Sequence, residues 1–215
     1  MNVLFASKCY GGDYYHFLKD AFNKKWQSCN YPFDTKWLLI NNDVPSDAYC
    51  QLKAEQIIDV SKYEDIVLKY FKLKKKNFNG GYIYSIAELI AIYLAQRFNY
   101  LCWLQGDVLM NKKEDWITPA IKILEDNPNI SVVAPLSELN TYHNDKGLDH
   151  FFSDHAYLIR VSEFRKKIYN YKKPELNEYP SHGGNSFERM IGRYLHNTNK
   201  YRKILNEFYT LHPAY

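Results

Sequence analysis

The sequence has 215 residues, of which 46% are hydrophobic and 24% charged, the composition of one globular domain with a sizeable core. Its formal net charge of +4 is mild, whereas nucleic-acid-binding domains usually concentrate more positive charge on one face, so charge argues against that class. The N-terminus lacks a signal-peptide pattern and no apolar run is long enough to span a bilayer, so we expect a soluble, cytoplasmic protein.

Alternating strand and helix patterns begin at the N-terminus. The expected elements of this part are strands at 2–6, 36–41 and 56–60 and a helix at 14–26. Gly11-Gly12 indicates a turn between the first strand and the first helix. Ser61 precedes Glu64 by three residues, which is the capping-box spacing at the start of a further helix.

The stretch 82–97 has the periodicity of a helix that packs one face on a sheet. The apolar positions that fall on one stripe are Ile83, Ile86, Ala87, Ile90 and Leu94. Ser85 and Glu88 fall off that stripe. The next apolar run, from Asn99, ends at Gln105-Gly106-Asp107, so a buried strand delivers a carboxylate to the edge of a sheet.

The rest of the chain continues the alternation of helices and strands. The expected elements are a helix at 114–126, strands at 130–134 and 156–161, helices at 162–169 and 185–195, and a C-terminal tail. Four cysteines without CxxC spacing predict a reducing compartment and no zinc. The alternation predicts a single α/β domain with a mostly parallel central sheet flanked by helices.

Two motifs together resemble the GT-A fold of nucleotide-sugar glycosyltransferases. A helix leads into an apolar strand that ends in Gln105-Gly106-Asp107, similar to the family's Asp-x-Asp, with an amide in place of the first carboxylate. A second stretch, from Phe152 to Arg160, is similar to the family's strand on the acceptor side. The resemblance implies a Rossmann-like fold with a nucleotide-binding half at 1–110 and an acceptor-binding half at 111–215.

The resemblance also implies a site for the nucleotide sugar and a divalent cation. Asp107 would bind Mn²⁺ or Mg²⁺, Gln105 could add a carbonyl oxygen, and a late histidine of the family corresponds to His212. Ser7 and Tyr10 occupy the place where the first strand meets the nucleotide base. Asp107 also suits an ordinary turn or helix cap, and Ser7 with Tyr10 an ordinary strand-to-helix turn.

Residues of the second half are candidates for the acceptor side. Glu188, at the start of an expected helix, resembles the base of inverting GT-A enzymes, although a Glu three residues after Asn185 is also an ordinary helix start. Asp154 competes for the base role, or is a loop carboxylate. His182 could bind phosphate or the acceptor, or be a solvated loop residue, and the same alternatives apply to His155.

The first hypothesis is therefore a hexosyltransferase-type enzyme that moves a sugar from a nucleotide sugar, most simply a UDP-sugar, to a hydroxyl of a glycan or glycoconjugate. The alternative is a non-catalytic nucleotide- or carbohydrate-binding module of the same fold, for which the missing first carboxylate argues. A nucleic-acid-binding protein that uses Lys72–Lys76 ranks last, because nothing in the sequence shows base-reading elements. A solvated helix end explains the lysine run more simply. We expect no nucleic-acid partner and no membrane span.

Overall fold

The computed structural model describes residues 1–12, 14, 20–137, 147–174 and 187–211. Its strands are β1 (Val3–Cys9), β2 (Thr35–Ile40), β3 (Gln56–Asp59), β4 (Tyr100–Leu104), β5 (Leu109–Met110), β6 (Ile130–Ser137), β7 (Leu148–Asp149), β8 (Ala156–Arg160) and β9 (Tyr201–Leu211). Its α-helices are α2 (Ala21–Ser28), α3 (Glu64–Phe71), α4 (Tyr82–Leu94), α5 (Ile117–Asp126), α6 (Val161–Phe164) and α7 (Phe187–Thr198). Short 3-10 helices are η1 (Ser46–Gln51), η2 (Val60–Lys62) and η3 (Lys75–Gly81).

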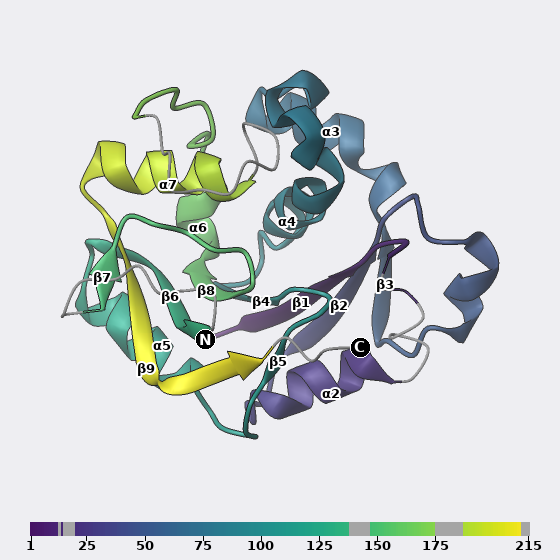
Figure 1. Cartoon of the computed structure of the whole chain (residues 1–215), viewed down its shortest axis with the longest axis horizontal. Coiled ribbons are helices and arrows are strands. Elements are labelled where there is room, and N and C mark those ends of the chain that lie inside the picture. Colours follow the sequence, from purple (N-terminus) through teal and green to yellow (C-terminus); the bar gives the residue numbers. More distant parts are fainter. Residues whose placement is uncertain (13, 15–19, 138–146, 175–186, 212–215) are drawn as a thin grey trace.

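The strands form one mixed sheet in the order β3-β2-β1-β4-β8-β6-β9-β5, with β7 paired to β9 (Figure 1). Strands β3, β2, β1 and β4 run parallel to one another, and β6 and β9 form a further parallel pair. Strand β8 runs antiparallel between β4 and β6. The expected single α/β domain is confirmed, and beyond β4 the sheet is mixed, with β8, β5 and β7 pairing antiparallel to their neighbours.

Apolar residues of the strands alternate between the two faces of the sheet, as the pleat of a strand requires. Leu4 and Ala6 face the helices α3, α4 and α7, whereas Val3 and Phe5 face α2 and α5. Figure 1 shows these two layers of helices on opposite sides of the sheet. Because both faces are covered, β1 and β4 are fully buried runs without polar alternation.

Helix α4 is buried more completely than its single stripe predicts. Ser85 and Glu88 are buried, whereas Ile83, which we expected on the packed stripe, is 37% exposed. The reason is that α4 packs on β1 and also touches α3 and α7, so most of its circumference is covered. The stripe is buried as expected at Ile86, Ala87 and Ile90, whereas the expectation for Ile83 was wrong.

Other boundaries also differ from the sequence prediction: the helix expected at 162–169 is only the short α6, and β1 extends to Cys9. Ser61 does not cap a helix: it lies in η2, where its backbone N–H donates to the Asp59 side chain. Glu64 begins α3 and pairs with Lys75 at 2.8 Å. The tail from Tyr201 is the long strand β9, which gains regular hydrogen bonding by lying beside β6. Of the helix expected at 14–26, the described residues include α2 and a helical Tyr14.

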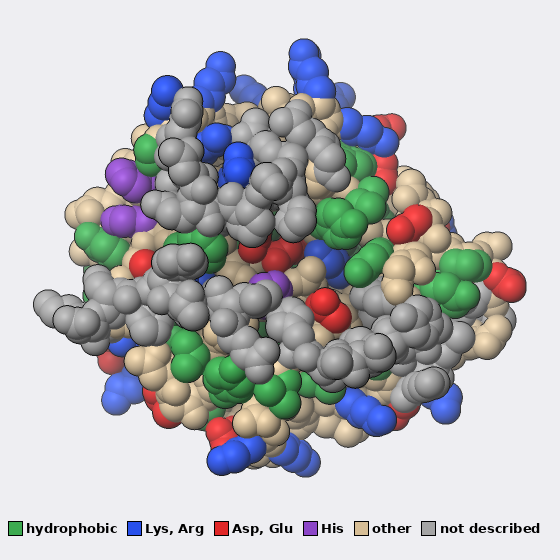
Figure 2. Space-filling model, viewed as in Figure 1, with side chains coloured by type: hydrophobic (Ala, Val, Ile, Leu, Met, Phe, Trp, Pro, Cys, Tyr) green, Lys and Arg blue, Asp and Glu red, His purple; other side chains and the backbone are tan. Residues whose placement is uncertain are grey.

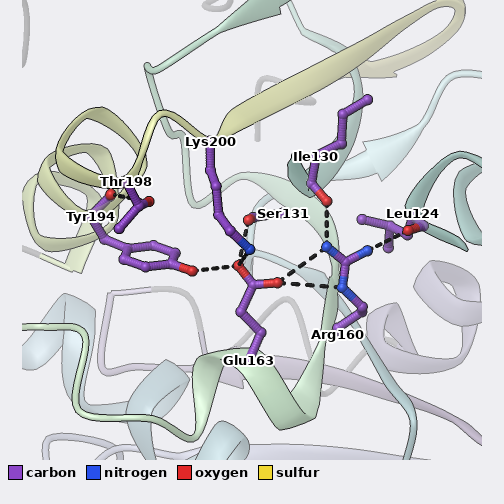
Figure 3. Close-up of polar contacts among 8 residues, drawn as sticks. All are labelled: Leu124, Ile130, Ser131, Arg160, Glu163, Tyr194, Thr198 and Lys200. Atoms are coloured by element: carbon purple, nitrogen blue, oxygen red, sulfur yellow. Dashed lines mark hydrogen bonds and ion pairs between the residues drawn. The ribbon is translucent and has the colours of Figure 1, made fainter. Parts of the chain in front are cut away.

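A polar network locks the end of β8 to its neighbours (Figure 3). The carboxylate of Glu163, on α6, accepts hydrogen bonds from Ser131, Tyr194, Lys200 and Arg160. Arg160 also donates to the carbonyls of Leu124 and Ile130. Burial works to raise the pKa of Glu163, but the bonds from Ser131, Tyr194 and Lys200 outweigh it and lower the pKa. The network therefore joins α6 to β6, α7 and the start of β9.

Within the described ranges, each helix is too short or too polar to cross a membrane.

Candidate active site at the carboxyl ends of β1 and β4

The carboxyl ends of β1 and β4 lie side by side where the order of the parallel strands reverses. From β1 the chain continues to β2 on one side, while β4 pairs with β1 on the other. In open α/β sheets this reversal leaves a crevice in which ligands bind. Figure 2 shows acidic, basic and histidine side chains gathered near the middle of the corresponding face.

The turn after β1 brings the first two predicted site residues to this edge. Ser7 is fully buried, and its Oγ has no hydrogen-bond partner among the described residues. Tyr10 is partly exposed and packs edge to face on Tyr84 of α4, with ring centroids 5.8 Å apart. A Cβ on Gly12 would lie 2.5 Å from the Tyr10 ring, so glycine permits this close turn.

Lys8, between these two residues, is the first charged group of the site. Its side chain is fully buried, and its ammonium donates a hydrogen bond of 2.6 Å to the carbonyl of Tyr84. The same nitrogen lies 3.8 Å from Glu88 Oε1 and 3.7 Å from Asp154 Oδ2. A buried lysine is tolerated only with partners of this kind, so the ammonium and its two carboxyl neighbours form one electrostatic unit.

Glu88, on α4, is the most deeply buried acid of the unit. Its side chain is 0% exposed, and neither carboxyl oxygen has a hydrogen-bond partner among the described residues. Burial raises the pKa of Glu88 to about 8; Lys8 acts to lower this pKa, and Asp154 to raise it. The Glu88 carboxyl is therefore neutral through most of the physiological pH range.

The two candidate bases, Asp154 and Glu188, are in contact. The backbone N–H of Asp154 donates to Glu188 Oε1 at 3.1 Å. Burial raises the pKa of Glu188 well above its ordinary value, and the nearby Asp154 raises it further. Glu188 is placed by the start of α7, where the Phe187 N–H donates to Ser85 Oγ at 3.0 Å. Helices α4 and α7 thus converge on Asp154.

The Gln105-Gly106-Asp107 turn follows β4 on the other side of Asp154. The backbone N–H of Gln105 donates to the carbonyl of His155 at 2.8 Å, which ties the turn to the segment before β8. From α2, the buried ammonium of Lys25 donates to the carbonyls of Gln105 at 3.1 Å and Val108 at 2.7 Å. These bonds hold the turn on both sides, with Asp107 partly exposed at its tip.

The chemistry of this turn suits a hard divalent cation. Gln105 Oε1 is buried without a hydrogen-bond partner among the described residues, and with Asp107 it offers the oxygen ligands that Mn²⁺ and Mg²⁺ prefer. Within the described ranges, no three His, Cys, Asp or Glu side chains lie close enough to hold an ion. A bound ion would therefore need further ligands, such as phosphate oxygens or an imidazole nitrogen of His212. Both His212 and His182 lie outside the described residues.

The remaining histidine of the prediction, His155, lies directly between Asp154 and β8. Its Nδ1 is 2.9 Å from Ser153 Oγ, so its ring orientation is set by its own loop. His155 is partly exposed, which leaves part of the ring accessible at the edge of the site.

Sequence reasoning missed the buried part of the site, Lys8 and Glu88. Each is a single charged residue within or directly after an apolar segment, and the cost of burying a charge makes such a residue a candidate for a special role. That signal was present in the sequence. What was hidden is that the two belong together, because 80 residues separate them.

No protein-family model and no curated protein matches the sequence. The structure, in contrast, is similar to solved structures across the whole chain. One is mouse xyloside xylosyltransferase 1 in its apo form, at a TM-score of 0.53 and 9% identity, covering 95% of this chain and 84% of that one. Another is glucosyl-3-phosphoglycerate synthase from Mycobacterium tuberculosis in complex with Mn²⁺, UDP and phosphoglyceric acid, at a TM-score of 0.55 and 10% identity, covering 100% and 71%. The chain has the GT-A fold of these glycosyltransferases.

Proposed function

We propose that this protein is a glycosyltransferase that moves a sugar from a UDP-sugar to a hydroxyl of a glycan or glycoconjugate acceptor. The observation that carries the proposal is the contact of Asp154 with Glu188 beside the Gln105–Asp107 turn. It brings acids suited to an acceptor hydroxyl next to a turn suited to a nucleotide diphosphate, within a fold shared with glycosyltransferases.

Asp154 is the better candidate for the base. A general base must be ionised before it accepts a proton, and burial raises the pKa of Glu188 well above its ordinary value, which disfavours the ionised form of that carboxyl. Asp154 lies 3.7 Å from the Lys8 ammonium and is 14% exposed, so it is both paired with a cation and reachable. In this proposal Asp154 takes the proton of the acceptor hydroxyl, and Glu188 orients that hydroxyl by hydrogen bonding.

The donor would bind along the carboxyl ends of β1 and β4, within the nucleotide-binding half at 1–110. Tyr10 would stack on the nucleotide base and Ser7 would hydrogen-bond it, while His182 of the acceptor-binding half at 111–215 would contact phosphate or acceptor. Asp107, Gln105 and His212 would hold Mn²⁺ or Mg²⁺, which would neutralise charge on the departing diphosphate. The buried Lys25 keeps the backbone of this turn in place.

The donor half of the proposal is tested by thermal unfolding with UDP, GDP or CMP, each with and without Mn²⁺. A ligand at 100 times its dissociation constant adds about 2.7 kcal/mol to stability. For a domain of this size that corresponds to an increase of roughly 5–10 °C in Tm. We expect an increase for UDP that needs Mn²⁺ and is lost in Asp107→Ala. An increase without Mn²⁺ would remove the cation from the proposal, and no increase with any nucleotide would contradict UDP binding.

The acceptor half is tested by sugar transfer and by hydrolysis of UDP-sugars. Replacing a general base lowers turnover by about 10²–10⁴-fold, so Asp154→Asn should do so while UDP binding persists. Glu188→Gln, which keeps a neutral hydrogen-bonding group, is the matched variant and should lose less. A wild-type protein that binds UDP but neither transfers nor hydrolyses any sugar would instead be the non-catalytic binding module.

A further inference from the structure

Lys8 occupies a central position among the acids of the candidate site. Its ammonium is fixed by the carbonyl of Tyr84 and lies nearly equidistant from Glu88, on α4, and Asp154, in front of β8. The Lys8 side chain is 0% exposed, so it forms no part of the protein surface. An ammonium in such a place acts through the groups that it touches.

The charged and titratable groups around Asp154 come from four elements. Lys8 comes from β1, Glu88 from α4, Glu188 from α7 and Tyr157 from β8, with His155 as the chain neighbour. Glu88, Glu188 and Tyr157 would all disfavour a negative charge on Asp154 if they ionised, whereas Lys8 favours it. Tyr157 stays neutral, because burial raises its pKa well above the ordinary value.

Exposure and protonation state distinguish the two carboxyls that Lys8 touches. The 3.8 Å from Lys8 Nζ to Glu88 Oε1 and the 3.7 Å to Asp154 Oδ2 are both ion-pair distances, but Glu88 is 0% exposed whereas Asp154 is 14% exposed. With its pKa raised to about 8 by burial, Glu88 is uncharged at neutral pH. Of these two carboxyls, Asp154 is then the one that pairs with the Lys8 ammonium and remains within reach of an acceptor.

Resting on the function proposed above, we propose that Lys8 is a positioning residue, which orients the Asp154 carboxylate as the acceptor-side base through their 3.7 Å ion pair. Glu88 is an uncharged neighbour of the Lys8 ammonium and does not form a charge pair with it. Asp154 alone touches the acceptor hydroxyl; Lys8 acts through Asp154.

The first test is the pH profile of transfer for Lys8→Met, which removes the charge and keeps the length of the side chain. An opposite charge within 4–6 Å typically shifts the titration of a carboxyl by about 1–3 pH units. We expect the acidic limb of kcat to move upward by that amount, with rate recovered at high pH and little change in donor KM. Lys8→Arg, which keeps the cation, should restore the limb in part. Lys200→Met, a lysine paired with Glu163 away from the site, is the control and should leave the limb in place.

The second test determines whether the charge of Lys8 acts on Asp154 or on Glu88. The double variant Lys8→Met/Glu88→Gln removes the ammonium and also makes the Glu88 position permanently uncharged, so Glu88 cannot contribute to the pH profile. We expect it to keep the displaced acidic limb of Lys8→Met, because Asp154 still lacks its cation. A wild-type profile in the double variant would show that Lys8 only compensates Glu88, and would overturn the inference.

Failure of this inference and failure of the proposed function give different results. If the wild-type protein transfers sugar but Lys8→Met leaves the limb unmoved, the positioning role is wrong and the function stands. If no turnover is found, carboxyl ¹³C NMR resonances, assigned with Asp154→Asn, report the titration of Asp154 without any reaction. An unchanged midpoint in Lys8→Met would then refute the effect of Lys8 on Asp154.

Discussion

Two buried glutamates, Glu163 and Glu88, have nearly the same exposure and opposite surroundings. Glu163 is 8% exposed and accepts hydrogen bonds from Ser131, Tyr194, Lys200 and Arg160 (Figure 3). Glu88 is 0% exposed and has no hydrogen-bond partner among the described residues. The first pKa is lowered from its ordinary value and the second is raised to about 8.

The difference separates a structural carboxylate from a functional one. Donors that satisfy every lone pair make a buried carboxylate stable as an anion, and such a network locks elements together. A buried carboxyl without donors costs stability, and persists where a site requires it. The two glutamates should therefore respond in opposite ways to substitution and to pH.

The largest effect is expected for Glu163→Ala. Removing one partner of a buried ion pair leaves Lys200 and Arg160 uncompensated and typically destabilises by about 3–5 kcal/mol. Because the folded pKa of Glu163 is lowered, this contribution is present above the unfolded pKa near 4.5 and is lost as pH falls through the folded value. Denaturant unfolding from pH 7 to pH 3 measures it. Glu55→Ala, which removes a half-exposed partner of Lys36, should cost below about 1 kcal/mol.

A gain in stability, of comparable size at most and opposite in sign, is expected for Glu88→Gln. Between the ordinary value of 4.5 and about 8 the unfolded chain has released this proton and the folded chain retains it. Each pH unit in that window therefore lowers wild-type stability by about 1.4 kcal/mol. The variant lacks this slope, so its advantage should grow with pH and reach on the order of 4 kcal/mol at pH 8. An advantage that does not change between pH 5 and pH 8 would contradict the assignment of a neutral Glu88.

The smallest changes in stability are expected for two tyrosines, Tyr194 in the Glu163 network and Tyr157 in the candidate site. Tyr194 donates its hydroxyl hydrogen to Glu163, and a hydrogen bond to a charged group contributes about 1.5–3 kcal/mol, so Tyr194→Phe should destabilise by about 2 kcal/mol. The Tyr157 hydroxyl is buried without a hydrogen-bond partner among the described residues. Tyr157→Phe should therefore be neutral or stabilise by less than about 1 kcal/mol. Equal losses in thermal unfolding would mean that the two regions do not differ in this way.

Features that depend on local sequence were predicted, whereas features that depend on distant segments were not. The apolar run that ends at Asp107 predicted β4 and its acidic tip, because an uninterrupted run of this length is typical of a strand covered on both faces. Asp154 and Glu188 were named as alternatives, and the structure brings them into contact across 34 residues of chain. Strand β9 was missed because its hydrogen bonds come from β6, which lies far upstream.

The sequence by itself determined the alternation of strands and helices, the GT-A resemblance and the acids that could serve chemistry, because these depend on local pattern and residue type. Only the tertiary structure decided that Lys8 and Glu88 belong to the site, that Glu88 is held neutral and that the pKa of Glu188 is raised. The physical reason is that the protonation state of a carboxyl depends on burial and on neighbouring charges. At this site those neighbours come from β1, α4, α7 and the segment before β8, which only the folded chain brings within 4 Å of one another.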